Sequence, residues 1–223
     1  MNEGDYPIAA PGWASIDKAC SIVHGDALPH QFTSSTAYEL DSPNPLPAIC
    51  VWEAMGQQWH YVTYGLSELF EKTSPQLDVS GFGFELTFRL ARAEGETKPP
   101  GWPLRLLQGI AQYVMSGHGE LDTGHIVDLG EPLVTGSDLQ GVVCVPDPQL
   151  GKVDTVHGSV LFLLLVGVCA DEITAMDGWD LVRKVGLVSE LAASGITEPH
   201  RGSWRADPRR ATTFRRYELK VMI

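Results

Sequence analysis

The sequence has few basic residues and no long apolar run. Its 223 residues include 16 Lys and Arg against 28 Asp and Glu, a formal net charge of −12. This balance argues against nucleic acid as a partner, because neutralising phosphates requires an excess of positive charge on the binding face. The longest apolar run, residues 160–169, is about half as long as a transmembrane helix of roughly 20 residues. We therefore expect neither a nucleic-acid nor a membrane partner.

Cysteine is also scarce, and its spacing excludes the common disulfide and zinc motifs. The chain has four cysteines, with no CxxC pair among them: Cys20, Cys50, Cys144 and Cys169. Each has apolar or β-branched neighbours, which favours buried free thiols in a reducing compartment. The N-terminus carries acids and no basic segment ahead of an apolar run, so it shows no secretory signal. We expect a cytoplasmic protein.

Motifs of the common enzyme classes are missing as well. The sequence has no GxSxG elbow, no Walker lysine and no HExxH. The SGFGFEL glycines resemble the start of a dinucleotide fingerprint, but the third glycine is absent and a strand follows instead of a helix. We therefore expect no cofactor and no bound metal. One alternative stays open, a metal-dependent hydrolase around residues 117–125, where His118 and His125 flank a glycine-rich loop that also contains Glu120 and Asp122.

The clearest pattern that is present lies in residues 80–92, SGFGFELTFRLAR. Apolar residues from Phe82 to Leu90 alternate with a polar set that includes Glu85 and Arg89, which is the period of a half-buried strand. We expect the phenylalanine face to lie in the core and the polar face to be available for binding. Gly81 and Gly83 indicate a bend or a close approach of another backbone.

The remaining chain predicts helices and strands in alternation without an internal repeat or linker. Apolar spacing and Pro/Gly boundaries predict helices over residues 11–25, 103–117, 171–176 and 179–193, and a short helical turn over 67–72. Strands are predicted at 30–38, 49–55, 59–66, 125–129, 142–145, 152–156 and 160–169.

These elements indicate an α/β (α+β) fold, one domain with a mixed β-sheet flanked by helices. We divide the chain into a flexible N-terminus (1–10), the domain (11–203) and a basic tail (204–223), for which we expect either a closing strand or poor packing. Residues 198–223 hold seven Lys and Arg against three Asp and Glu, so the acidic excess belongs to the body of the chain. An acidic body suits solubility and also a basic partner.

Several segments, taken in order, resemble the Suppressor-of-fused domain family. They cover about residues 11–203 and read PGWASIDKA, QQWHYVTYGLSEL, SGFGFELTFRLAR, KPPGWPLRLLQGIAQYVM, DPQL, FLLLVGVCADEI and ITEPHRGS. The resemblance implies a mixed-sheet α/β domain without enzymatic activity. In animals the family holds zinc-finger transcription factors inactive by gripping an extended peptide, which adds as a strand between two lobes. Only the first lobe has a counterpart in this chain.

The resemblance also suggests a function and contact residues. Single-domain bacterial members are thought to act as immunity proteins that neutralise toxins, so we expect a non-enzymatic module that sequesters a toxin or another protein partner by occlusion. A regulator that binds a transcription-factor peptide by strand addition is the alternative. The candidate contacts are Phe70, Asp78 and Glu85. Phe70 matches an animal aromatic that carries a hydroxyl, and Asp78 lies one position nearer the SGFGFEL motif than the animal acid.

Overall fold

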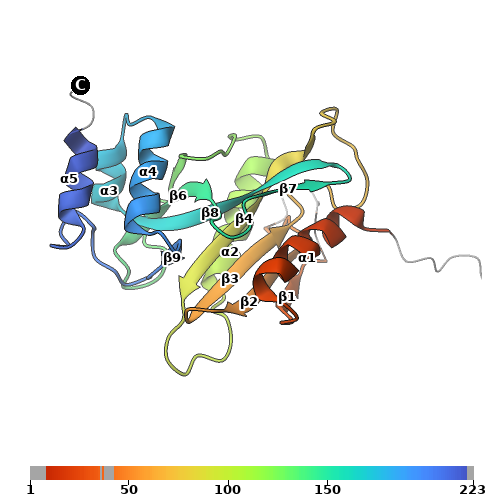
Figure 1. Cartoon of the computed structure of the whole chain (residues 1–223), viewed down its shortest axis with the longest axis horizontal. Helices are drawn as coiled ribbons and strands as arrows, with labels where there is room; N and C mark the ends of the chain where they lie inside the picture. The colour runs from red at the N-terminus through yellow and green to blue at the C-terminus, as the bar shows by residue number, and fades with distance from the viewer. Residues whose placement is uncertain (1–8, 36, 38–42, 220–223) are drawn as a thin grey trace, which may run out of the picture.

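A computed structural model describes residues 9–35, 37 and 43–219, which form a mixed sheet with helices on both faces (Figure 1). The helices are α1 (Pro11–His24), α2 (Trp102–Met115), α3 (Ala170–Met176), α4 (Leu181–Leu191) and α5 (Ala211–Leu219). The strands are β1 (His30–Thr33), β2 (Ala48–Ala54), β3 (Gln58–Tyr64), β4 (Val79–Ala91), β5 (Ile126–Asp128), β6 (Leu139–Pro146), β7 (Lys152–Thr155), β8 (Gly158–Cys169) and β9 (Ile196–Thr197). The predicted fold class is confirmed.

The sheet has the order β1-β2-β3-β4-β8-β6-β5, with β7 beside β8 and β9 beside β4. The pairs β4–β8 and β4–β9 are parallel, and the others are antiparallel. The two longest strands, β4 and β8, therefore lie side by side at its centre. Sequences far apart in the chain meet there, with Phe84 opposite Leu161 and Phe88 opposite Leu165.

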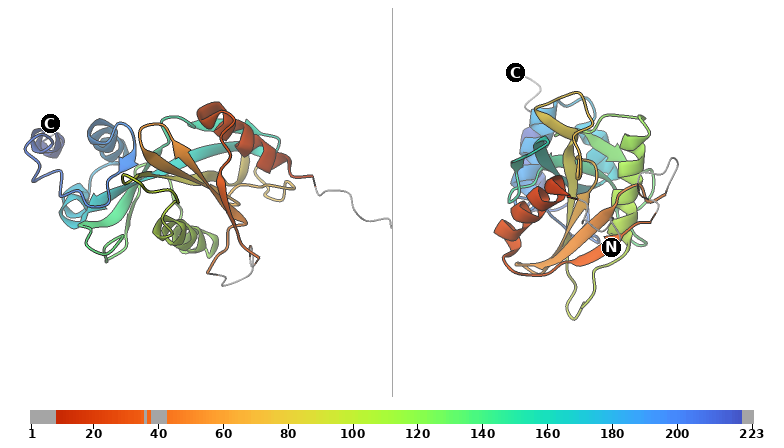
Figure 2. Two further views of the ribbon diagram at one scale, coloured as in Figure 1. Left: turned by 90° about the horizontal axis from the view of Figure 1, so that it is seen from below. Right: turned by 90° about the vertical axis from the view of Figure 1, so that its right-hand side faces the viewer.

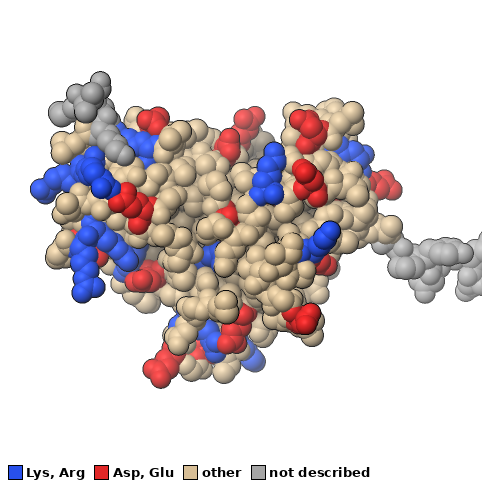
Figure 3. All heavy atoms as spheres, viewed as in Figure 1, with Lys and Arg blue, Asp and Glu red and all other residues tan. Residues whose placement is uncertain are grey.

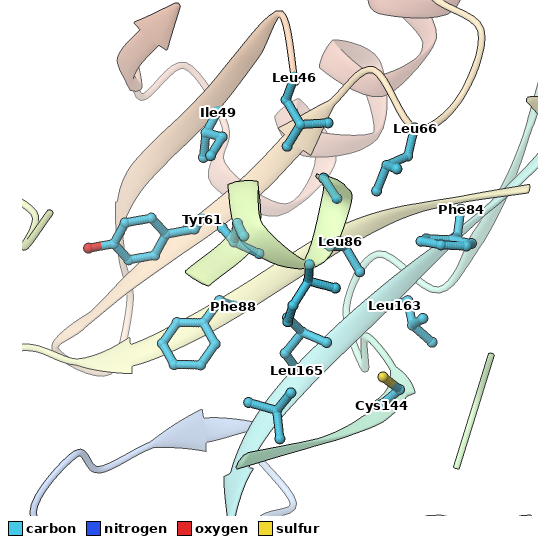
Figure 4. Packing of buried hydrophobic residues seen from close by; sticks show 14 of the residues in the cluster. Leu46, Ile49, Tyr61, Leu66, Phe84, Leu86, Phe88, Cys144, Leu163 and Leu165 are labelled. Atoms are coloured by element: carbon cyan, nitrogen blue, oxygen red, sulfur yellow. The ribbon is translucent and has the colours of Figure 1, made fainter. Parts of the chain in front are cut away.

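Helix α2 covers one face of the sheet. It packs on the apolar residues of β4, including Phe84, Leu86 and Phe88, and on Leu163 and Leu165 of β8 (Figure 4). The predicted apolar face of residues 80–92 is thus confirmed from Phe84 to Leu90. Phe82 differs, since its side chain is 48% exposed.

Helices α1 and α3–α5 cover the opposite face (Figure 2). This face has two halves, and successive residues of β8 on it belong to different halves. Phe162 packs with the α1 cluster, whereas Leu164 packs with the cluster under α4 and α5. The central strands are consequently buried on both sides, in keeping with the continuous apolar sequence of β8. All four cysteines are buried and unpaired, as predicted.

Two expected elements differ from the structure. Residues 67–72 form bends instead of a helical turn, and the side chain of Glu68 accepts hydrogen bonds from Thr73 and Ser74, just beyond that segment. The predicted strand at 30–38 is ordered as β1 over His30–Thr33, and residues 36 and 38 lie outside the described residues. Residues 1–8 of the expected flexible N-terminus also lie outside them.

The tail is a helix over Ala211–Leu219, not the closing strand that we expected. Phe214 and Tyr217 are one helical turn apart, so both side chains reach the core from one face. Trp204 and Phe214 are each 1% exposed and belong to the cluster under α4 and α5. The boundary at residue 204 therefore falls inside the packed body. Residues 220–223 lie outside the described residues.

None of the helices in the described ranges is long and apolar enough to cross a membrane.

Candidate protein-binding site

The segment that joins β3 to β4, together with the first residues of β4, carries three large apolar side chains that are exposed. Leu77 is 82% exposed, Phe82 is 48% exposed and Phe70 is 39% exposed. Asp78, beside Leu77, is exposed too. We call the side chains of Phe70, Leu77, Asp78 and Phe82 the 65–82 surface. Several large apolar side chains exposed along one short stretch of chain make it a candidate contact site.

Glu85 fixes the start of this segment from below. Its carboxylate accepts hydrogen bonds from the Gly65 and Ser67 amides, each at 2.9 Å, and from the hydroxyls of Ser67 and Thr63, each at 2.6 Å. The side chain is 0% exposed. Burial raises the pKa of Glu85, and these hydrogen bonds act in the opposite direction.

The expectation that Glu85 contacts a partner is therefore wrong. The polar face of β4 is buried under α1 and α3–α5 instead of facing solvent. Glu85 lies opposite Phe162, and Thr87 lies opposite Leu164, on the face that these helices cover. Of the three candidate contacts, Phe70 and Asp78 lie on the surface. Glu85 instead holds the backbone of residues 65–67, at the start of the loop that carries Phe70.

Glu68 fixes the other half of the segment. Its carboxylate accepts hydrogen bonds from the amides of Ser74 and Gly81 and from the Lys72 ammonium, which lies 2.9 Å away. Burial acts to raise the pKa of Glu68, but these hydrogen bonds outweigh it and lower the pKa to about 2. The carboxylate is ionised at neutral pH and ties residues 72–74 to the start of β4.

Gly81 and Gly83 create the bend at which Phe82 turns outward. Both have positive φ, at 56° and 86°, and the register between β4 and β8 shifts between Val79 and Phe84. A Cβ on Gly81 would lie 2.6 Å from the Leu66 carbonyl oxygen. Both roles that the sequence suggested for these glycines, a bend and a close backbone approach, are thus confirmed.

A second buried polar group lies further along β4 on the same face as Glu85. Asp147, just after β6, accepts hydrogen bonds from Arg89 at 2.9–3.1 Å and from the Thr87 hydroxyl at 3.0 Å. The amides of Gln149 and Leu150 complete its shell. Burial acts to raise the pKa of Asp147, but His60 and Arg89 hold it well below its usual range. This ion pair joins β4 to the β6–β7 connection.

Two histidines continue this network toward the surface. His60 Nδ1 lies 2.9 Å from Nε2 of His24, whose ring stacks on Trp52 at 4.8 Å. The other ring nitrogen of His60, Nε2, lies 3.4 Å from Oδ2 of Asp147. Burial lowers the pKa of both histidines, that of His24 to about 4. Both rings are neutral at pH 7.

These histidines predict a loss of stability in mild acid. Between pH 6.5 and about 4 the unfolded chain binds a proton at His24 that the folded chain does not bind, so the free energy of unfolding falls as the pH falls. We expect the change from pH 7 to pH 4.5 to be smaller in His24→Gln by about 1 kcal/mol, because solvent screens part of the effect at this half-buried ring, measured by urea unfolding at each pH. Groups that do not contact His24 contribute equally to both proteins, and of the titratable groups in the described residues His60 is the one in direct contact with it. Parallel pH profiles would contradict this assignment.

Replacing Glu85 by Gln tests its role as an anchor. The carboxylate of Glu85 acts only as an acceptor in these hydrogen bonds. In Glu85→Gln one of its two oxygens is replaced by an NH2 group, which would face the donors that now bind that oxygen. We expect the free energy of unfolding to fall by about 2–3 kcal/mol and hydrogen exchange to accelerate at residues 65–67. Glu71→Gln, on the exposed part of the segment, is the control. Unchanged exchange in Glu85→Gln would contradict an anchoring role.

The glycine-rich loop does not assemble a metal site. His118 stacks on Tyr113, with ring centroids 6.0 Å apart, whereas Nδ1 of His125 lies 3.2 Å from the carbonyl oxygen of Glu120. Within residues 9–35, 37 and 43–219, no three His, Cys, Asp or Glu side chains gather in a way that could hold a metal ion.

Sequence reasoning missed the anchors and part of the surface. Asp147 had a signal, since an Asp followed by Pro commonly begins a turn in which its carboxylate accepts backbone hydrogen bonds. Glu68 had none, because its partners lie up to 13 residues away along an irregular segment. The alternation of β4, continued through the bend, wrongly predicts a buried Phe82.

Comparison with known proteins gives consistent matches. The profile of the family "Suppressor of fused protein (SUFU)" matches residues 43–202. The Suppressor of fused homolog of Mus musculus is 36% identical over 192 residues, which cover 78% of this chain and 40% of the mouse protein. This chain thus spans less than half the length of that relative.

Solved structures of related proteins have the same architecture. The crystal structure titled the Sufu-Fu complex has a TM-score of 0.79 at 28% identity and covers 92% of this chain and 98% of the compared chain. The putative SUFU homolog from Neisseria gonorrhoeae has a TM-score of 0.59 at 15% identity, over 86% of this chain and 96% of its own, and supports the fold alone. The profile match spans well over half of the sequence, and the chain belongs to the Suppressor of fused family.

Proposed function

We propose that this chain is a non-catalytic, cytoplasmic protein-binding module that sequesters a protein partner by covering its active surface. The carrying observation is the 65–82 surface, on which three large apolar side chains stand exposed while Glu85 and Glu68 fix the backbone beneath them. A fixed loop loses little conformational entropy on binding, so exposed aromatic residues on it contribute efficiently to affinity. A related structure is titled a complex of Sufu with Fu, which agrees with protein binding.

We further propose that the partner is a basic toxin domain and that this chain is its immunity protein. The net charge of −12 favours fast association with a basic protein. On the face that Figure 3 shows, Lys and Arg side chains are most crowded at the α5 end. The 65–82 surface lies toward the opposite end and includes Asp78.

Affinity capture from the source cells tests this proposal. Wild-type protein should retain a specific partner, and Phe70→Ala should bind it about tenfold or more weakly, as for an aromatic residue at the centre of an interface. Phe32→Ala is a matched control, since Phe32 is 38% exposed and Phe70 is 39% exposed, but Phe32 lies on the edge strand β1. Co-expression with the captured partner should restore growth only if that partner is toxic. Equal retention by wild type and Phe70→Ala would contradict the assigned surface.

A further inference from the structure

A large hollow lies away from the 65–82 surface, between α2 and the α3–α4 region. It has a volume of about 1290 Å³. One wall is the outer face of α2, including Leu106, Gly109 and Tyr113, and the other includes Ile173 of α3 and Lys184 of α4. The strand β5 lies between these walls. We call this hollow the β5 groove.

Strand β5 is an edge strand with one side unused. It pairs with β6, and within the described residues no strand pairs with its other side. The Cys144 amide donates to the His125 carbonyl and the Leu129 amide donates to that of Gln140, so the backbone groups of 125, 127 and 129 turn toward β6. By the alternation of an antiparallel pair, those of Ile126 and Asp128 turn toward the free edge. These amide and carbonyl groups can accept one further strand.

The wall formed by α2 leaves space for a chain to approach. Gly109 lies in the middle of this helix, where glycine is unfavourable compared with alanine. A Cβ at this position would meet no atom within 4 Å, so packing inside the protein does not require glycine. Tyr113, one turn further on, is 48% exposed in the same groove. The bare position beside an exposed aromatic ring suits a bound backbone with an apolar side chain.

The charges around the groove select the occupant. Its lining includes two basic residues, Arg105 and Lys184, and four acidic residues: Glu120, Asp128, Glu131 and Asp177. Asp128 is on β5 itself, where an added strand would bring its side chains close. An extended segment with alternating basic and apolar residues is complementary to this lining.

We propose that the β5 groove binds an extended basic and apolar segment of a partner protein, which adds as a strand to the free edge of β5. This site is separate from the 65–82 surface, and a partner can engage one without the other. The main chain of the bound segment forms hydrogen bonds with the backbone of Ile126 and Asp128, and the apolar side chains of that segment lie against α2.

The probe for this proposal is an acetylated eight-residue peptide of alternating lysine and valine with a central tyrosine. Titration of the full chain, followed by amide NMR shifts, should perturb residues 126 and 128 and residues of α2. N-methylation of an alternate set of peptide amides should weaken binding by about tenfold or more, because it removes donors to the β5 carbonyls. Glutamate in place of lysine should weaken it by a similar factor.

The variant Gly109→Leu should fill the groove and also weaken binding by about tenfold or more, while the helix stays folded. Gly202→Leu is the matched control, because a Cβ there also meets open space and Gly202 lies outside the groove.

Several results would overturn the proposal. These are no binding up to about 1 mM peptide, full affinity of both peptides when each alternate set of amides is N-methylated in turn, or shifts confined to residues 70–82, which would instead favour the 65–82 surface. Self-association of the chain that Gly109→Leu abolishes would also overturn it, since the edge would then serve a second copy.

Discussion

Asp147→Ala should lower the free energy of unfolding by about 3–5 kcal/mol, a large share of the roughly 5–15 kcal/mol of a typical domain. The reason is the guanidinium of Arg89, which is 1% exposed and whose positive charge is balanced by the carboxylate of Asp147. Removing the carboxylate leaves a positive charge buried without compensation, and it also frees the Thr87 hydroxyl and two backbone amides. Urea unfolding followed by tryptophan fluorescence at pH 7 measures the change.

Asp154→Ala provides the control, because Asp154 is exposed on the neighbouring strand β7. Its effect should stay within about 0.5 kcal/mol. The double variant Asp147→Leu/Arg89→Met removes both charges and should recover much of the lost stability, since apolar residues of similar volume often replace a buried ion pair without cost. A loss below about 1 kcal/mol in Asp147→Ala would show that Arg89 finds water or another partner.

The position of this ion pair explains why it is buried. Arg89 and Thr87 share a face of the sheet with Phe162 and Leu164, between the cluster under α1 and the cluster under α4 and α5. Buried polar side chains thus lie between two apolar clusters. These polar side chains are the ion pair, Glu85 and His60, and they form hydrogen bonds and ionic contacts with defined directions. We infer that they fix the register of β3, β4 and the β6–β7 connection relative to one another.

The elements that sequence predicted well are those whose signal is local. Helix α2 begins next to Pro103 and buries an apolar stripe that includes Leu107, Ile110 and Val114. Strand β8 was recognisable because a continuous apolar sequence of its length fits a strand covered on both faces. The family resemblance rested on such segments, and the profile match confirms it.

The candidate site was predicted only in part because exposure depends on distant segments. Glu85 alternates with apolar residues in sequence as a solvent-facing residue would, yet α1 and α3–α5 cover its face. No local pattern shows that the loop amides of Gly65 and Ser67 turn back onto it. Phe70 and Asp78 are exposed, and their contact with a partner stays a prediction.

The C-terminal tail shows the same limit in another form. The sequence predicted a closing strand there, but Phe214 and Tyr217 occupy one face of the helix α5, and Arg215 and Arg216 are exposed. Arg205 pairs with Glu218 at 3.0 Å, and Arg216 pairs with Glu190 of α4. Exposed ion pairs of this kind contribute little. The aromatic side chains must therefore supply most of the docking energy.

Deleting residues 204–223 should therefore abolish the folded state instead of trimming a loose end. The deletion removes Trp204, Phe214 and Tyr217 from the cluster under α4 and α5, and truncating even one buried aromatic side chain costs about 3–5 kcal/mol. Phe214→Ala alone should lower the free energy of unfolding by that amount. In Phe82→Ala, where the ring is 48% exposed, the loss should be about 1 kcal/mol or less. Circular dichroism and urea unfolding of the truncated chain, Phe214→Ala and Phe82→Ala measure these losses.

The outcomes distinguish a tail that is an appendage from a tail that is part of the core. If the truncated chain unfolds cooperatively with wild-type stability, α5 is an appendage and the boundary near residue 204 is real. If it fails to fold while Phe82→Ala remains stable, the basic tail is part of the domain core.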